Sequence, residues 1–177
     1  MSNNPVSVLM DEHDVIKKIE NSLAKLDGLW EKDAPKYKAT LEKILHFLKQ
    51  YSDAYHHHKE EDVLFPALEE HPEFILSSII TEMNEHHENF RDYTRAIAEA
   101  LQENNYRKAQ DTLKKYLNEL LDHIAIENDE LFVLAESLFD EEELKTMFFK
   151  FKDIDMELGE SKKAELEKFP DEIENSL

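Results

Sequence analysis

Residues 56–66 read HHHKEEDVLFP, and this stretch decides the fold because its pattern returns at residues 123–132, which read HIAIENDELF. In both stretches a His is followed four residues later by a Glu, and a Leu-Phe pair stands eight and nine residues after the His. Four residues make about one helical turn, so the imidazole and the carboxylate of each stretch lie on one helical face. Each pair is therefore placed to hold the same metal ion or two adjacent ions.

The composition indicates a helical protein. The 177 residues suit one domain and include no Cys, which excludes disulfides, thiolate metal sites and a cysteine nucleophile. His, Asp and Glu remain as the strong metal ligands. Only 2 Gly and 5 Pro occur in the chain, together with many Glu, Lys, Leu and Ala residues, which is typical of long helices. We therefore predict an all-α protein.

The charge of the chain opposes two classes of partner. With 41 acidic and 21 basic residues the net charge is -20, which disfavours nucleic acid and anionic membrane. The sequence has no apolar run of about 18 residues and no secretion signal, so we expect a cytoplasmic protein. The oligomeric state is not indicated.

Helix-start and helix-stop signals divide the chain. Apolar residues recur at spacings of three and four between these signals, which predicts helices over roughly 5–27, 34–71, 76–103, 106–139 and 140–159. Pro66 is expected to kink or interrupt the second helix, and a short helix broken at Pro170 is expected near the end. Short loops predict an up-down-up-down four-helix bundle with an additional C-terminal helix. We divide the chain into a metal-binding bundle over 1–160 and a charged tail over 161–177.

The first and third helices repeat one apolar pattern around a single His. Apolar residues stand 7 and 4 positions before His13 and 3, 6 and 10 positions after it, and the same offsets around His87 are apolar or aromatic. Counted from His86, these offsets fall mostly on polar residues. Adjacent helical residues point in directions about 100° apart, so His87 is expected to face the bundle interior in place of His86.

In the second helix, the register of the later stretch selects His56 with Glu60. The competing pair, His57 with Glu61, would place Phe65-Pro66 where the Leu-Phe pair belongs. The predicted metal ligands are therefore His13, His56, Glu60, His87, His123 and Glu127.

Four imidazoles and two carboxylates match a site for two borderline metal ions, which could be Fe, Mn or Zn. Each ion would have two His and a share of two bridging Glu, with room for a solvent bridge and an open position. Two alternatives remain. A single His on an apolar face is also typical of a packed core, and the His tract at 56–58 is typical of a surface with adventitious metal affinity. Four acidic residues are either partners that orient the imidazoles or solvated charges: Asp53, Glu61, Glu119 and Asp122.

The motifs resemble those of the hemerythrin-like HHE cation-binding domains over roughly residues 5–135. The matching segments are LMDEH at 9–13, HHHKEEDVLFP at 56–66, EHHENFR at 85–91 and HIAIENDELF at 123–132. The resemblance implies a four-helix bundle around a non-haem di-iron centre with an oxo or hydroxo bridge. It also implies that the four predicted His are terminal ligands and that the two Glu are bridging.

One departure concerns the third helix. Oxygen-carrying members of the family have a second His one turn after the ligand of this helix, where the present chain has Arg91. The four-His, two-Glu set is more similar to bacterial di-iron proteins that repair iron-sulfur clusters and handle nitric oxide, many of which carry an N-terminal Cys that is absent here.

Three functions are compatible with these features. The first is a module that binds or senses dioxygen or nitric oxide at an open iron position. The second is a di-iron oxidase or peroxidase, and the third is an iron-handling protein for storage or for iron-sulfur cluster repair. The predicted partner of the first is a small diatomic ligand, and the sequence contains no motif that assigns catalysis.

Overall fold

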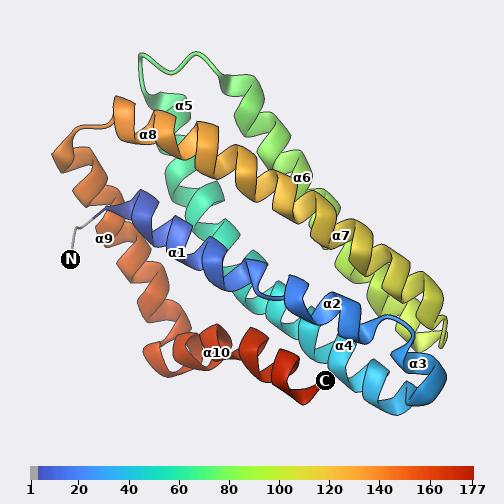
Figure 1. Cartoon of the computed structure of the whole chain (residues 1–177). Coiled ribbons are helices and arrows are strands. Elements are labelled where there is room, and N and C mark those ends of the chain that lie inside the picture. The colour runs from blue at the N-terminus through green and yellow to red at the C-terminus, as the bar shows by residue number, and fades with distance from the viewer. Residues whose placement is uncertain (1–3) are drawn as a thin grey trace.

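The computed structural model describes residues 4–177, which form long helices packed side by side (Figure 1). No strand occurs between these residues, which confirms the all-α class. The elements are α1 (Pro5–Lys17), α2 (Glu20–Leu26), α3 (Leu29–Lys32), α4 (Ala34–Phe47), η1 (Leu48–His57), η2 (Glu60–Leu64), α5 (Phe65–Glu70), α6 (Ser77–Gln102), α7 (Tyr106–Ile126), η3 (Glu127–Leu131), α8 (Phe132–Leu138), α9 (Glu141–Leu158) and α10 (Glu160–Ser176).

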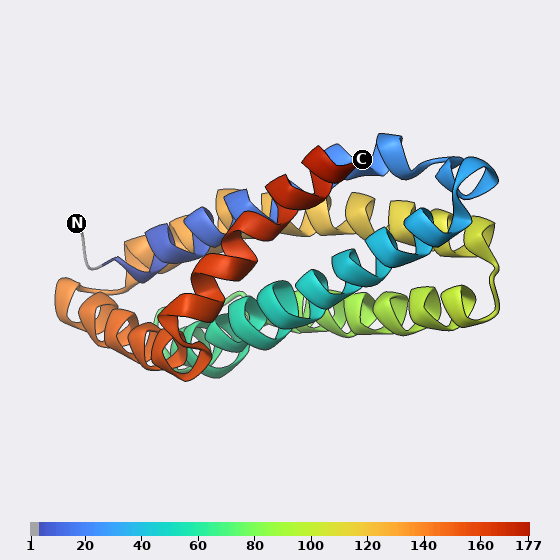
Figure 2. The ribbon, with the colours of Figure 1, turned by 90° about the horizontal axis from the view of Figure 1, so that it is seen from below.

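The first predicted helix is divided in two. Asn4 caps α1 by accepting a hydrogen bond from the backbone N–H of Val6, as its position before Pro5 suggests. At Lys18 and Ile19 the backbone N–H groups donate to carbonyls three residues earlier, which tightens the turn between α1 and α2. Helix α1 packs against η1 and α8, and α2 packs against α7, so the two pieces together still form one helix of the predicted bundle (Figures 1 and 2).

The second and fourth helices of the bundle contain π-helical turns. In η2 the N–H of Phe65 donates to the carbonyl of Glu60, and in η3 the N–H of Phe132 donates to that of Glu127. Both hydrogen bonds span five residues, one more than in an α-helix. The two repeated stretches therefore share a backbone feature as well as a sequence pattern. Pro66 follows the π-helical turn η2 without ending the helix, because it stands in the first turn of α5.

The C-terminal part of the chain differs from our expectation. We predicted a short helix broken at Pro170 with a loose end, but α10 continues through Pro170 to Ser176. Leu166 and Ile173 bury their side chains, and α10 packs against α2 and α4. Figure 2 shows α10 lying diagonally across these helices. Helix α9 begins with the predicted capping box of Asp140 and Glu143 and packs against α1, η1 and η2.

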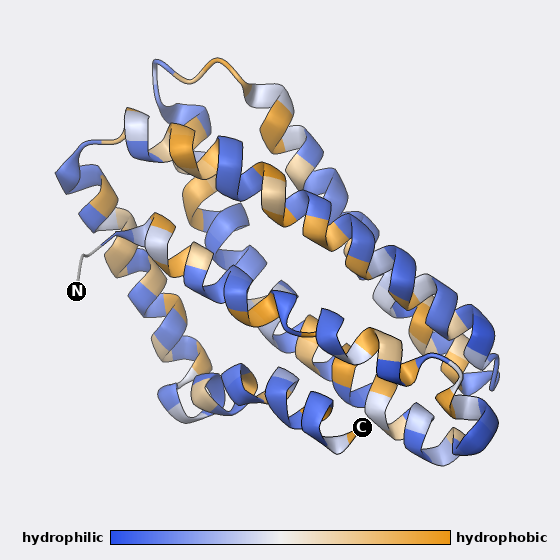
Figure 3. Cartoon of the chain, in the orientation of Figure 1, coloured by the Kyte–Doolittle hydropathy of each residue, from blue (hydrophilic) through white to orange (hydrophobic). Residues whose placement is uncertain are grey.

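The core follows the apolar stripes of the helices. Orange apolar segments and blue polar segments alternate along each helix in Figure 3, as expected for amphipathic helices around one interior. Buried residues such as Leu9, Leu41, Phe90 and Leu113 come from four different helices and form one cluster. In the part of the chain that the structure describes, no helix has the length and apolar character needed to cross a membrane.

Candidate metal centre

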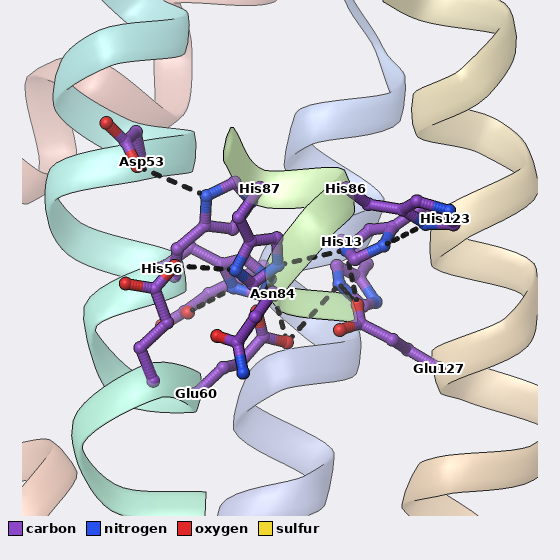
Figure 4. Close-up of polar contacts among 12 residues, drawn as sticks. His13, Asp53, His56, Glu60, Asn84, His86, His87, His123 and Glu127 are labelled. Atoms are coloured by element: carbon purple, nitrogen blue, oxygen red, sulfur yellow. Dashed lines mark hydrogen bonds and ion pairs between the residues drawn. The ribbon is translucent and has the colours of Figure 1, made fainter. Parts of the chain in front are cut away.

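Side chains from four helices of the bundle converge in its interior (Figure 4). The six residues predicted as metal ligands each expose 1% or less of their surface. They are His13 on α1, His56 on η1, Glu60 on η2, His87 on α6, His123 on α7 and Glu127 on η3. The structure therefore brings all six together, and His87 lies in the interior as its register predicts.

The potential ligand atoms form two groups that share one carboxylate. Within each group the atoms lie within 4.8 Å of one another. The first, which we call the His13 group, consists of His13, His56, Glu60 and Glu127. The second, the His87 group, consists of His57, Glu60, His87 and His123. Four donors around each of two positions form a suitable arrangement for a pair of metal ions.

The two oxygens of Glu60 face different groups. Its Oε1 lies 3.3 Å from Nε2 of His56, whereas its Oε2 lies 3.5 Å from Nε2 of His87. Glu127 also connects the groups, because its Oε2 lies 3.2 Å from Nε2 of both His13 and His123. Each carboxylate is therefore positioned to bridge two ions.

The centre contains buried polar atoms without hydrogen-bond partners. These are both carboxylate oxygens of Glu60 and of Glu127, together with Nε2 of His13 and of His56. A buried polar atom without a partner destabilises a fold by about 1–3 kcal/mol, so such atoms rarely cluster without a reason. Carboxylate oxygens and imidazole nitrogens are ligands of borderline metals, and all six atoms face one small region. These residues therefore fit a metal centre.

His57 is a residue that our sequence reasoning left out of the ligand set. It exposes 2% of its surface, its ring stacks on that of His87 with centroids 3.7 Å apart, and it belongs to the His87 group. We treated His56 and His57 as alternatives because neighbours on an α-helix diverge by about 100°. The π-helical segment η1 has more residues per turn, so successive side chains diverge less and both face the interior.

Each of the five imidazoles has a polar contact at its Nδ1 atom. His13 contacts Asn128 at 2.9 Å, His56 contacts Glu12 at 3.0 Å and His57 contacts Asp53 at 3.3 Å. His87 contacts Glu61 at 2.7 Å, and His123 contacts His86 at 3.3 Å. Contacts of this kind fix the orientation of a metal-binding imidazole and leave the other nitrogen, Nε2, for the metal.

Two of these outer partners were among our sequence candidates, Asp53 and Glu61. Glu119 was another candidate, but it accepts a hydrogen bond from Tyr93. Sequence reasoning missed Glu12 and Asn128, although each is adjacent to a predicted ligand in the chain. That adjacency was the available signal.

Arg91 holds two of the outer carboxylates in place. Its guanidinium donates to Asp53 at 2.8 Å and to Glu61 at 2.8 Å, and these carboxylates contact His57 and His87. The position one turn after His87 therefore supports two imidazoles from outside the centre. The third nitrogen of the His87 group comes instead from His57 on η1.

The surroundings shift several pKa values. Burial lowers the pKa of His57 well below its usual range, and the neighbouring His87 lowers it further. His57 is therefore a neutral imidazole with a lone pair available for a metal. Burial raises the pKa of Glu127, but His123 and His13 outweigh this effect and hold it well below its usual range. Glu127 is therefore an anion, the form in which a carboxylate can bind a metal ion.

A small cavity adjoins the centre. It has no room for a water molecule, and its lining combines imidazoles of both groups with the apolar Ile16, Leu120 and Ile124 and the hydroxyl-bearing Ser52. Ser52 stands one turn before His56, whereas Glu60 stands one turn after it. Leu120 and Glu127 likewise lie on opposite sides of His123 in the chain. The cavity is therefore on the side of the imidazoles that faces away from the two carboxylates.

Comparison with known proteins gives one match. The family model described as the hemerythrin HHE cation binding domain matches residues 4–135. This range contains both groups of potential ligands and ends before α9. No curated protein and no solved structure matches the chain.

Proposed function

Because the chain belongs to the hemerythrin HHE cation binding domain family, we propose that its centre holds two iron ions and binds a small diatomic ligand, dioxygen or nitric oxide, at an open iron position. In this proposal His13 and His56 hold one ion, and His87 and His123 hold the other. Glu60 and Glu127 bridge them, and His57 is an additional ligand of the second ion. The donor set would also accept Mn or Zn.

The ligand set supports iron in a reduced state. Five imidazoles and two carboxylates contribute fewer negative charges than a carboxylate-rich site, which favours low-valent metal. Iron in this state supplies the electrons with which dioxygen or nitric oxide is held. The protein provides orientation through the Nδ1 contacts of the imidazoles and excludes water by burying every donor.

The observation that carries the proposal is the cavity beside the imidazoles. As it stands it has no room for a water-sized molecule, so a ligand enters only when the side chains that line it move, and it is far smaller than the pockets of roughly 300–1,000 Å³ that take ordinary substrates. Three aliphatic side chains line it, so it suits a small apolar molecule. This size favours binding of a diatomic ligand over an oxidase or peroxidase that admits an organic substrate.

Ser52 adds one polar group to this cavity. Its side chain is fully buried, and its Oγ has no hydrogen bond of ordinary geometry, although it lies near the phenol of Tyr116. A buried hydroxyl without a partner is costly and can rotate to donate to a molecule in the cavity. We infer that Ser52 donates a hydrogen bond to the bound diatomic ligand.

The test uses protein loaded anaerobically with two equivalents of ferrous iron. Nitric oxide and dioxygen are added in separate titrations, and optical spectra are recorded before and after the gas is removed. We expect a spectral change that saturates with each gas and reverses on its removal. Continuous consumption of dioxygen would favour the oxidase, and iron without any gas adduct would favour an iron-handling protein.

The choice between His86 and His87 tests the assignment of the ligands. His87→Ala should abolish the spectrum of the paired ions, because it removes a donor from the centre. His86→Ala should change it only slightly, because His86 lies outside both groups and reaches the centre only through the Nδ1 atom of His123. The opposite result would contradict the proposed ligand set.

A further inference from the structure

A fully buried lysine connects the centre with the C-terminal helices. Lys59 exposes none of its surface, although an ammonium group is costly to bury without partners. Its Nζ donates to Tyr55 Oη at 2.7 Å and to Asp155 Oδ1 at 2.8 Å, and it also forms an ion pair with Glu12 Oε1. Lys59 therefore joins a residue of α1 to a residue of α9.

Glu12 extends this connection to a metal-binding imidazole. One of its oxygens pairs with Lys59, while the other, Oε2, accepts a hydrogen bond from Nδ1 of His56 at 3.0 Å. Glu12 exposes only 3% of its surface, so its position depends on these two partners. A continuous line of contacts thus runs from Asp155 through Lys59 and Glu12 to His56.

Asp155 lies outside the part of the chain that matches the family. The match ends at residue 135, and Asp155 is on α9. Further contacts hold its carboxylate in place. Oδ2 accepts from Lys152 at 2.7 Å and lies 3.6 Å from Lys163, and Oδ1 accepts from the phenol of Tyr55.

The two groups of ligands differ in whether their supporting residues all lie within the part of the chain that matches the family. Behind the His87 group, Arg91 holds Glu61 and Asp53 with the help of Glu88, and all these residues belong to the matched range. Behind the His13 group, the supporting cation Lys59 takes one of its carboxylate partners from α9. Only the His13 group, among the residues described, is tied to the C-terminal helices through an outer carboxylate and its cation.

We propose that α9 is a working part of the metal centre, in which Asp155, Lys59 and Glu12 act as positioning residues for His56 and so set how tightly the His13 group holds its ion. Asp155 balances the charge of Lys59. Without the negative charge of Asp155, Lys59 attracts the carboxylate of Glu12 more strongly, and Glu12 becomes a weaker acceptor for His56 Nδ1. The imidazole of His56 then becomes a less basic and less well oriented ligand. This inference rests on the two-ion centre proposed above.

The experiment measures iron release from the full chain. Parent protein, Asp155→Asn and Asp153→Asn are each loaded anaerobically with two equivalents of ferrous iron, and excess ferrous chelator is then added. Asp153 is the matched control, because it is an exposed carboxylate on the same helix. The side chain of Asp155 is only 12% exposed but lies at the outer end of the line, so the Asn variant is expected to fold.

We expect Asp155→Asn to release one of the two ions about 10-fold faster, because loss of an outer partner commonly weakens metal binding by roughly 10- to 100-fold. The other ion should leave at the parental rate, and Asp153→Asn should match the parent for both. Asp155→Glu should restore slower release. Glu12→Gln, which changes the direct partner of His56, should accelerate the same ion more than Asp155→Asn does.

Two results would overturn the inference. One is a release profile of Asp155→Asn that matches the parent. The other is equal acceleration of both ions together with a lower melting temperature of the metal-free variant, since that pattern indicates general loosening by loss of α9 packing. A parent chain that binds no iron would instead refute the metal centre, and this would be evident before any variant is compared.

Discussion

Removal of the metal should destabilise the bundle by an amount that the centre itself indicates. The perturbation is dialysis of the iron-loaded chain against a chelator. In the metal-free chain the four carboxylate oxygens of Glu60 and Glu127 remain buried without hydrogen bonds. Metal-free protein must therefore retain a charged, dry centre or open it to water, and both are unfavourable.

The magnitude follows from those four oxygens. At the low end of about 1 kcal/mol for each unsatisfied buried atom, they cost about 4 kcal/mol. The two unpaired imidazole nitrogens are left out of this figure, because a proton on His56 relieves part of their cost. Although burial lowers the pKa of His56, Glu60 and Glu12 raise it to about 10. For a chain of this size, about 4 kcal/mol corresponds to a melting temperature lower by roughly 8–16 °C.

Calorimetric melting of the iron-loaded and metal-free chains measures this difference. A matched variant, Glu60→Met with Glu127→Met, separates metal binding from fold stability. Methionine is close in volume and carries no charge, so the metal-free variant should melt above the metal-free parent while it fails to retain iron. Equal melting temperatures of the loaded and metal-free parent would refute this reasoning, because the orphaned oxygens would then have cost nothing.

Three further predictions concern single residues. His57→Ala should lose one of two iron ions by elemental analysis, whereas His58→Ala, a half-exposed neighbour paired with Asp62, should keep both. Ser52→Ala should release nitric oxide roughly 5- to 10-fold faster in stopped-flow measurements, because one hydrogen bond contributes about 1 kcal/mol, and an unchanged rate would exclude contact with the ligand. Burial raises the pKa of Asp155, but Lys152 and Lys59 lower it below its usual 3.8. The stability that the ionised Asp155 contributes is therefore present above about pH 4 and is lost as the pH falls through its pKa in the folded chain. In urea titrations, Asp155→Asn should therefore lose less stability in acid than the parent chain does.

Periodicity was sufficient to predict the helices of the bundle and most of the residues that face the interior. The offsets shared by His13 and His87 report which face of each helix is apolar, and burial of that face is what places both rings inside. The repeated His-x-x-x-Glu spacing likewise follows from the helical turn. These features are local, so the sequence determines them directly.

The features that the sequence did not predict depend on geometry that local sequence patterns do not contain. His57 faces the interior because η1 is π-helical, and the register argument assumed an α-helix. The pairing of Glu12 with Lys59 joins residues 47 positions apart. Helix α10 passes through Pro170 because burial of Leu166 and Ile173 against neighbouring helices compensates for the missing hydrogen bond. Such tertiary contacts override the local breaking signal.

The paired π-helical turns at Glu60 and Glu127 constrain how these helices can change length. A π-helical turn is equivalent to one residue inserted into an α-helix. Deleting one residue from η2 or η3 would restore α-helical spacing and rotate everything beyond it by about 100°. The buried Phe65 and Leu68 of α5, or Phe132 and Ala135 of α8, would then leave the core. The spacing between each of these two buried carboxylates and the apolar residues that follow it is therefore fixed at the level of a single residue.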